Sequence, residues 1–214
     1  MARRYDCSTV SGRPAGLREA ASAVRRGELV VLPTDTVYGI GADAFNRGAV
    51  NSLLEAKGRG RAMPSPVLVA SPDALHDLVT DFSEQGWALV EAFWPGGLTL
   101  VARHQPSLDW DLGETHGTVA VRMPSHPAAL DLLARTGPMA VSSANLTGQP
   151  SPKDCDAAQG MLGDSVAVYL DGGPTEAAVA SSIVDITGAV PVLKRAGAIS
   201  AVRLRKVVPD LQEP

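Results

Sequence analysis

Two threonine hydroxyls and a carboxylate follow a short apolar run near the start of the chain. The segment 32–41 reads LPTDTVYGIG, so Thr34, Asp35 and Thr36 stand between a proline and two glycines. Open α/β sheets usually bind ligands at such turns, where a strand ends. The glycines would let a ligand approach the backbone closely. The alternative is a polar turn in which Thr34 and Asp35 hydrogen-bond only to nearby backbone N–H groups.

Three cations fall within the segment 57–61, which reads KGRGR. Lys57 continues the apolar face of the helix expected before it, so its side chain should point toward the protein body. A cation at a helix C-terminus gains about 0.3–1 kcal/mol from the helix dipole, which accounts for one of the three. The mutual repulsion of Lys57, Arg59 and Arg61 would be relieved by a polyanion such as a triphosphate.

An arginine ends another apolar run. The segment 117–124 reads GTVAVRMP, and Arg122 stands at the end of the expected strand, just before a proline turn. A charged side chain at the end of a buried strand needs a partner. Two partners remain open at this point: a carboxylate of the protein, in a structural ion pair, or the carboxylate of a ligand.

Small polar side chains follow two later apolar runs. In the segment 140–148, AVSSANLTG, Ser143 and Asn145 are two residues apart and would face the same side if the chain stays extended. A turn or a helix N-cap is the alternative. Further along, Ser181 begins the sequence SSIVD and Arg195 lies in KRAG. Each of these stretches is a weak signal when taken alone.

The sequence lacks several familiar motifs for nucleotides, metals and acyl transfer. It has no G-x-x-x-x-G-K-[ST] loop and no G-x-G-x-x-G after an expected strand. No Gly-x-Ser-x-Gly elbow occurs, and the four histidines show no metal-ligand spacing. A nucleotide would therefore be bound by an uncommon route.

The composition is that of one globular domain. The chain has 214 residues, of which 45% are hydrophobic and 20% are charged. Two cysteines exclude a disulfide framework, and no run of about 18 apolar residues could span a membrane. The N-terminus lacks an apolar signal core, so we expect a cytoplasmic protein that does not bind a membrane. A net charge of −4 argues against a dedicated nucleic-acid-binding protein, although a local basic groove stays open.

Short β-branched runs alternate with segments of helical periodicity. This pattern predicts an α/β fold with a mixed sheet, within a domain over 15–208. The expected strands are 29–32, 67–70, 98–102, 118–122, 139–141, 166–170, 183–186 and 190–194. The expected helices are 17–24, 50–57, 87–93, 126–135 and 199–207. The two ends, 1–14 and 209–214, are expected to be disordered.

Taken together, six stretches in a fixed order resemble one protein family. They read Pro-Thr-Asp-Thr-Val-Tyr-Gly, Lys-x-Arg, Arg-x-Pro-x-His-Pro, Ser-x-Asn, Ser-x-Ile-Val-Asp and Arg-x-Gly. This order resembles the YrdC/TsaC family of threonylcarbamoyl-AMP synthases, from about residue 16 to about residue 200. The resemblance implies a YrdC-like single domain of the short form, with a twisted mixed sheet, flanking helices and a concave ligand cleft.

The resemblance also implies a reaction. L-threonine, bicarbonate and ATP, the last with Mg²⁺, would give threonylcarbamoyl-adenylate and pyrophosphate. A downstream enzyme complex would then transfer the threonylcarbamoyl group to the adenosine beside the anticodon of tRNA. Weak binding of tRNA or another RNA by the protein itself is a further expectation.

The family motifs carry roles over to individual residues. The expected catalytic residues are Lys57, Arg59, Ser143 and Asn145. The expected ATP-binding residues are these four together with Thr118, Ser151 and Arg195. The expected threonine-binding residues are Thr34, Thr36, Arg122 and Ser181.

Four positions depart from the family pattern. Gly60 and Ala196 replace common prolines, Met63 replaces an asparagine, and Ala180 replaces a glutamate. A methionine cannot offer an amide to ATP, so Arg61 or a backbone group would have to take its place.

Two other functions compete with the synthase. One is an RNA-binding or ribosome-maturation module that uses the cations of 57–61 on a basic concave surface. The other is a carbamoyl-transfer domain of the kind found within larger hydrogenase-maturation proteins, which the short chain disfavours.

Overall fold

A mixed β-sheet organises the chain, of which the computed structural model describes residues 2–175 and 179–213. In these residues the sheet has eleven strands, in the order β1-β9-β2-β3-β8-β4-β7-β6-β10-β11, with β5 paired to β6. The strands are β1 (Arg3–Asp6), β2 (Val30–Leu32), β3 (Gly39–Asp43), β4 (Val67–Leu68), β5 (Val79–Thr80), β6 (Leu98–His104), β7 (Thr118–Arg122), β8 (Met139–Ser143), β9 (Val168–Asp171), β10 (Ser182–Asp185) and β11 (Val192–Arg195). The helices are α1 (Arg13–Arg25), α2 (Arg47–Ala56), α3 (Leu75–Leu78), α4 (Glu84–Phe93), α5 (Pro127–Thr136), α6 (Cys155–Leu162) and α7 (Ala201–Arg205).

Parallel and antiparallel pairings are interleaved across the sheet. β9 runs parallel to β1 and β2, and β6 runs parallel to β10. β3 runs antiparallel to both β2 and β8, and β7 runs antiparallel to β6. The predicted α/β class with a mixed sheet and flanking helices is confirmed.

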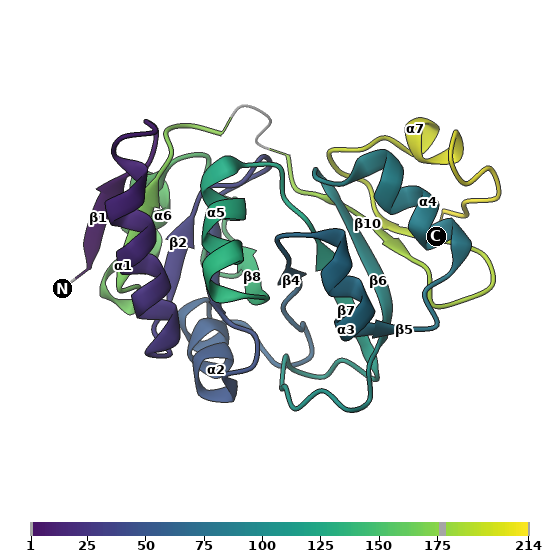
Figure 1. Cartoon of the computed structure of the whole chain (residues 1–214), viewed down its shortest axis with the longest axis horizontal. Helices are drawn as coiled ribbons and strands as arrows, with labels where there is room; N and C mark the ends of the chain where they lie inside the picture. Colours follow the sequence, from purple (N-terminus) through teal and green to yellow (C-terminus); the bar gives the residue numbers. More distant parts are fainter. Residues whose placement is uncertain (1, 176–178, 214) are drawn as a thin grey trace.

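Alternation of side chains in β2 and β9 builds two separate cores on the two faces of the sheet. Val30 and Leu32 pack with α1 and α5, whereas Val31 packs on the opposite face with α2 and α6. Val168 and Tyr169 divide in the same way. This is the period of two expected when both faces of a strand are covered. Figure 1 shows α1 and α5 side by side over this part of the sheet.

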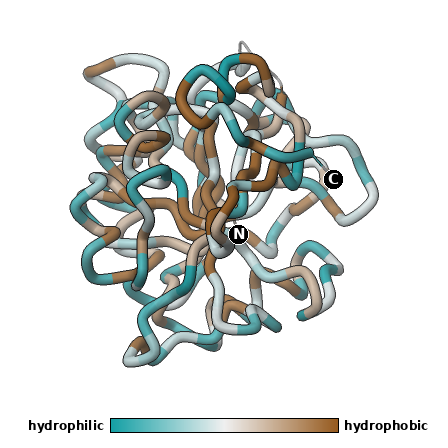
Figure 2. The backbone as a smooth tube through the Cα atoms, turned by 90° about the vertical axis from the view of Figure 1, so that its right-hand side faces the viewer, coloured by the Kyte–Doolittle hydropathy of each residue, from teal (hydrophilic) through white to brown (hydrophobic). Residues whose placement is uncertain are grey.

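A third core lies at the other end of the sheet. There α3, α4 and the segment around α7 cover β6, β7 and β10, and Leu100, Val121 and Leu204 are buried among them. In Figure 1 these elements form the right-hand part of the molecule. Figure 2 shows hydrophobic backbone segments gathered in the interior and hydrophilic ones at the outer turns.

The strand β3 is absent from the prediction, which interpreted its glycines as room for a ligand to approach the backbone. Gly39 and Gly41 lie within β3 because the neighbouring strand leaves no space for a side chain. A Cβ atom at Gly39 would lie 2.6 Å from Val141 Cγ1, and one at Gly41 would lie 2.8 Å from Met139 Cε. The glycines therefore allow close packing within the sheet.

The two ends of the chain differ from the expected disorder of 1–14 and 209–214. Residues Arg3–Asp6 form β1, which pairs with β9 and is held by ion pairs from Arg4 to Asp156 and Asp171. Near the C-terminus, Gln212 forms a bridge with Val192. Both segments lie at sheet edges, and each is mostly polar apart from Tyr5 and the buried Leu211. They therefore lack the apolar alternation by which strands are found in a sequence.

The helices α3 and α6 and the short strand β5 are also absent from the prediction. α3 and β5 are too short to show a hydrophobic period. α6 follows a polar segment and is started by Asp154, whose side chain accepts from the backbone N–H of Ala157. None of the helices in the described part of the chain is long and apolar enough to cross a membrane.

The tight packing at Gly39 gives a testable prediction. Gly39→Ala should lower the free energy of unfolding by about 1–3 kcal/mol, because the new methyl group overlaps Val141 in the adjacent strand. In urea denaturation, the double variant with Val141→Ala should lose less stability than the two single variants added together.

Gly160→Ala is the control for this prediction, because the added Cβ in α6 would meet no atom within 4 Å apart from its chain neighbours and the backbone of its own helix. It should leave stability unchanged or raise it by up to about 1 kcal/mol. An equal loss at Gly39 and Gly160 would contradict the packing explanation.

Candidate functional site

A cleft of about 250 Å³ opens where several strands of the sheet end. Its walls come from the turn between β2 and β3, from the segment after α2, and from β6, β7, β8, β10 and β11. Its polar lining is Thr34, Thr36, Arg59, Thr99, Arg122, Ser142, Ser143, Ser151, Ser181 and Arg195. A larger and more open recess of about 680 Å³ lies near Arg26 and Glu55 and contains none of the predicted site residues.

The hydroxyl of Thr34 is used within its own turn. It donates to the backbone oxygen of Val37 at 2.6 Å and accepts from the backbone N–H groups of Thr36 and Val37. Because its single proton is engaged, the 3.0 Å contact between the Thr34 and Thr36 hydroxyls must have Thr36 as donor. The polar-turn interpretation therefore holds for Thr34, although the residue borders the cleft.

Arg122 is buried and has partners on three sides. Nε donates to the backbone oxygen of Gly96 at 2.8 Å, Nη1 to Thr36 Oγ1 at 2.9 Å and Nη2 to Asp35 Oδ1 at 2.7 Å. Asp35 Oδ1 also accepts from the backbone N–H of Ser125. Burial lowers the pKa of Arg122, and the nearby Asp35 opposes this effect. A guanidinium has five N–H donors, so about two remain for a ligand in the cleft.

Lys57 is buried and lies beneath the cleft rather than in its lining. It caps the C-terminus of α2, and Nζ donates to the backbone oxygens of Ser143 and Asn145. The prediction that Lys57 points into the protein body is confirmed. Burial, with a smaller contribution from Arg59, lowers the pKa of Lys57 to about 8. Lys57 therefore fixes the turn that follows β8.

Arg59 enters the cleft and is held mainly by backbone oxygens. Nε donates to the oxygen of Met63 at 2.6 Å, Nη2 to that of Pro64 at 3.2 Å, and Nη1 to Ser142 Oγ at 2.9 Å. Burial, and then the proximity of Arg195, lowers the pKa of Arg59. The side chain of Met63 is exposed, so this position contributes its backbone oxygen.

Arg61 does not replace the asparagine expected at position 63. It is exposed, pairs with Asp111 at 2.6 Å and lies outside the cleft lining. The three cations of 57–61 thus diverge, with Lys57 buried, Arg59 in the cleft and Arg61 on the surface. They do not form the exposed basic patch that an RNA-binding module would use.

Ser143 and Asn145 do not share one side of the chain. β8 ends at Ser143, which lines the cleft, whereas the following chain turns. Asn145 Nδ2 donates to the backbone oxygens of Leu146 and Gln149, so its amide orders the next turn. Its Oδ1 is buried and has no hydrogen-bond partner among the described residues. The expected pair is thus one cleft residue and one residue of the supporting turn.

Thr118 does not reach the cleft. It begins β7, at the end of the strand opposite Arg122, and its hydroxyl donates to the backbone oxygen of Thr115 at 2.8 Å. The sequence resemblance placed it near the nucleotide, whereas Ser151 does line the cleft as expected.

Ser181 and Arg195 form a hydrogen-bonded pair with a residue that the sequence analysis missed. Arg195 donates to the backbone oxygen of Ser181 at 2.9 Å and to its Oγ at 3.0 Å. The hydroxyl of Thr99, in β6, lies 2.8 Å from the same Oγ. Thr99 stands in an apolar strand, and only its pairing with β10 brings it to the cleft.

The glycine of the Arg-x-Gly motif lets two backbones meet beside this pair. A Cβ atom at Gly197 would lie 2.4 Å from the backbone oxygen of Ala180. The next residue, Ala198, donates its N–H to that same oxygen. Any other residue at position 197 would therefore push Ser181 out of place.

The cleft carries an excess of positive charge. Arg122 is paired with Asp35, whereas neither Arg59 nor Arg195 has a carboxylate partner within 4 Å in the part of the chain that the structure describes. Burial lowers the pKa of both arginines. Arg59 is half-buried and Arg195 is exposed, so an anion in the cleft would mainly offset the loss of water around Arg59.

Comparison with known proteins agrees with the motifs. The family model for Sua5, YciO and YrdC proteins, described as "Telomere recombination", matches residues 22–197. The chain belongs to the Sua5/YciO/YrdC family. The predicted resemblance is confirmed.

Three relatives illustrate the similarity of this family member. A Mycobacterium tuberculosis protein named "Putative threonylcarbamoyl-AMP synthase" is 52% identical over 97% of this chain and 96% of its own length. The threonylcarbamoyl-AMP synthase of Bacillus subtilis is 40% identical over 90% of this chain. The structure of P. abyssi Sua5 complexed with L-threonine matches the whole chain with a TM-score of 0.93 at 34% identity. This chain spans 56% of the Bacillus protein and 62% of the P. abyssi chain.

Burial of Lys57 gives a prediction for the pH dependence of stability. The unfolded chain keeps this proton up to the ordinary pKa of 10.5, whereas the folded protein releases it from about pH 8. Between these values the unfolded state binds more protons, so this contribution to stability rises with pH. The free energy of unfolding of wild type minus that of Lys57→Met should rise by about 1–3 kcal/mol across this range.

Urea denaturation at several pH values measures this difference. Lys153→Met, which removes a lysine from an exposed position, gives the baseline. A difference that stays constant or falls with pH would show that folding does not lower the pKa of Lys57.

Proposed function

We propose that this protein is an L-threonylcarbamoyladenylate synthase, a nucleotidyltransferase that joins L-threonine, bicarbonate and ATP and releases pyrophosphate. The main support is one cleft that combines a buried arginine with free donors and two arginines that have no carboxylate partner among the described residues. The names of the close relatives, and the threonine complex of P. abyssi Sua5, support the same assignment. We place the reaction in the cytoplasm.

The Arg59 side of the cleft suits the phosphates of ATP. Arg59 and Arg195 supply unneutralised charge, and Ser143 and Ser151 supply hydroxyl groups nearby. Lys57 and Asn145 act from below by fixing the turn that carries Ser143.

Mg²⁺ is the metal that this reaction needs, and it would enter bound to ATP. The described residues contain no group of three or more His, Cys, Asp or Glu side chains that could hold a metal ion. Mg²⁺ in such sites is bound largely by phosphate oxygens and water, which fits a cleft lined by hydroxyls. It would neutralise phosphate charge as the pyrophosphate leaves.

The Arg122 side suits the amino acid. The remaining N–H donors of Arg122 can bind a carboxylate in a planar, two-point geometry. The hydroxyls of Thr36 and Ser181 face the same space and can bind the polar groups of threonine. Thr34 acts indirectly, because its engaged hydroxyl orients Thr36.

The chemistry requires positioning and charge neutralisation. The amine of threonine attacks the carbon of bicarbonate, and loss of water gives a carbamate. A carbamate oxygen then attacks the α-phosphorus of ATP, and pyrophosphate leaves. No covalent enzyme intermediate is needed, so the arginines act by orienting the substrates and offsetting negative charge. The product is a mixed anhydride, which a downstream tRNA-modifying enzyme complex would consume.

The proposed reaction predicts a requirement for three substrates. The purified protein should release pyrophosphate from ATP only when both threonine and bicarbonate are present, as measured with a coupled pyrophosphatase assay. Release without either co-substrate, or no release with all three, would contradict the proposed reaction.

The proposal also predicts that variants on the two sides of the cleft affect different substrates. Arg122→Lys should raise KM for threonine by at least about tenfold and leave KM for ATP within about threefold, because lysine cannot bind a carboxylate at two points. Arg59→Ala should weaken ATP binding instead, by about tenfold or more.

Steady-state kinetics, with circular dichroism to check folding, tests both variants. Thr118→Ala should behave as wild type, because this side chain lies outside the cleft. Equal effects of Arg122→Lys and Arg59→Ala on both substrates would contradict the division.

A further inference from the structure

Tyr38 stands where three segments of the cleft wall meet. Its backbone N–H donates to the oxygen of Pro152 at 3.2 Å, and its backbone oxygen accepts from the N–H of Ala144 at 2.8 Å. Ala144 lies next to Ser143, and Pro152 follows Ser151. The backbone of one residue thus joins the two segments that carry these cleft hydroxyls.

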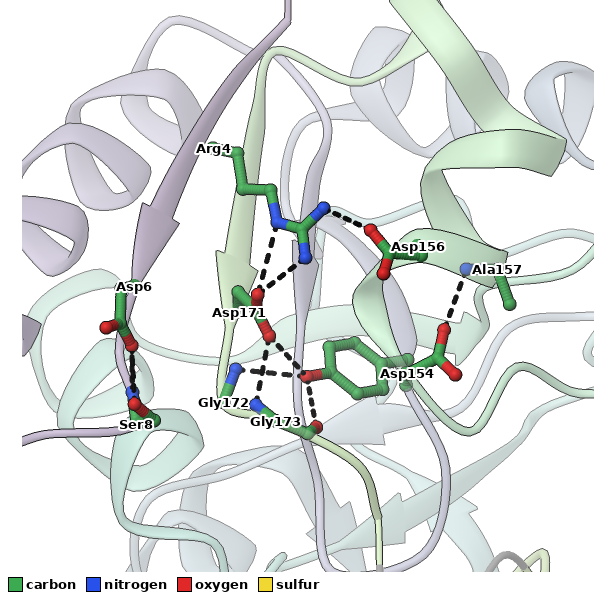
Figure 3. A network of polar contacts seen from close by, with 10 residues as sticks. Arg4, Asp6, Ser8, Asp154, Asp156, Ala157, Asp171, Gly172 and Gly173 are labelled. Carbon is green, nitrogen blue, oxygen red and sulfur yellow. Dashed lines mark hydrogen bonds and ion pairs between the residues drawn. The ribbon is translucent and has the colours of Figure 1, made fainter.

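The side chain of Tyr38 joins a third segment. Its hydroxyl donates to the backbone oxygen of Gly173 at 2.6 Å and accepts from the backbone N–H of Gly172 at 3.0 Å. It also lies 3.4 Å from Asp171 Oδ1. Figure 3 shows Asp171, Gly172 and Gly173 together at the end of β9. Tyr38 is among the residues that line the cleft, and it is fully buried. The proton of its hydroxyl is engaged by the backbone oxygen of Gly173, so the hydroxyl serves the bend after β9.

Asp171 anchors this arrangement to the outer strand. One of its carboxylate oxygens accepts from the backbone N–H of Gly173, and the other pairs with Arg4 of β1 at 2.6 Å. Arg4 also binds Asp156 of α6 (Figure 3). The bend at Gly172 and Gly173 is therefore fixed from two directions.

The same bend is connected to Ser151 by a second route. Two residues beyond Gly173, Thr175 donates from its backbone N–H to the oxygen of Lys153 at 2.7 Å and from its hydroxyl to the same atom at 3.1 Å. Lys153 is two residues from Ser151. The position of the Ser151 segment thus depends on the bend that the Tyr38 hydroxyl holds.

We propose that the hydroxyl of Tyr38 is a positioning group for the nucleotide side of the cleft. It acts through the bend at 172–173 and the segment 151–153, without touching the nucleotide. The inference rests on the proposed function, because it assigns that side of the cleft to ATP. The Arg122 side does not depend on this hydroxyl, since Arg122 is held by Asp35, Thr36 and Gly96.

Tyr38→Phe tests the inference, and Tyr169→Phe is its matched control. Tyr169 is also fully buried, in the same core as Tyr38, and its hydroxyl donates to the backbone oxygen of Gly163 at 2.7 Å, away from the cleft. Each change removes one buried hydroxyl. Tyr38→Phe should raise KM for ATP by about tenfold, the factor that the loss of a typical buried hydrogen bond represents. Its KM for threonine should stay within about twofold, and Tyr169→Phe should change neither KM.

Thermal unfolding of both variants separates positioning from general loss of stability. A similar fall in melting temperature with a change in KM for ATP in Tyr38→Phe alone supports the inference. Equal changes of KM in the two variants, or a rise in KM for threonine as large as that for ATP, would overturn it.

A second pair of variants keeps the test valid if Tyr38→Phe does not fold. Arg4→Ala removes the anchor of Asp171, whereas Arg3→Ala on the same strand removes only an ion pair with Glu19. Arg4→Ala should raise KM for ATP by at least about threefold, and Arg3→Ala should not. Indistinguishable kinetics of this pair would count against the inference. Failure of the proposed function would look different, since the wild-type protein would then release no pyrophosphate.

Discussion

The placement of four cations at the cleft is the constraint on which the site depends, and among the described residues only Arg122 of the four has a carboxylate within 4 Å. Lys57 and Arg122 are buried, Arg59 is half-buried and Arg195 remains exposed, and the partial loss of water lowers the pKa of each. Each of them donates to at least one backbone oxygen. A backbone oxygen satisfies a donor but leaves the positive charge in place. The protein therefore fixes the position of each cation and keeps most of the charge available for an anion.

The hydrogen bonds from these cations to backbone oxygens also fix the turns to which the oxygens belong. The oxygens that hold Lys57 belong to the turn after β8, and those that hold Arg59 belong to the turn before β4. The turns and the cations thus order one another. A site arranged in this way needs little rearrangement when an anionic ligand arrives, and such preorganisation is the main source of electrostatic stabilisation in enzymes. Arg122 is the exception, because Asp35 is already beside it.

Local patterns in the sequence were enough to predict the fold class and part of the site. Apolar periodicity placed Lys57 on the inner side of its helix, and the need of Arg122 for a partner followed from its place at a strand end. Both predictions are confirmed by local geometry. The position of Thr99 could not be predicted, because it depends on the pairing of β6 with β10, which are about 80 residues apart.

Two predicted site residues lie outside the lining of the cleft for the same reason. Asn145 and Thr118 were assigned to the cleft from the motifs around them, without knowledge of where each strand ends or which end faces the cleft. β8 stops at Ser143, so the alternation of side chains no longer applies two residues later. Thr118 and Arg122 belong to one strand but to opposite ends of it. Spacing in a sequence cannot determine such end effects, because tertiary contacts set the limits of each strand.

The two sides of the cleft are held by hydrogen-bond networks of different extent. Thr34, Asp35 and Thr36 come from one turn, and their network is completed by Arg122, the oxygen of Gly96 and the N–H of Ser125. The Ser151 side depends instead on Tyr38, on the end of β9, and through Asp171 on the edge strand β1. Edge strands have fewer neighbours and open at lower free energy than central ones. Local opening at β1 would therefore disturb the Ser151 side first and leave the Arg122 side intact, so changes far from the cleft can alter the binding of one substrate and spare the other.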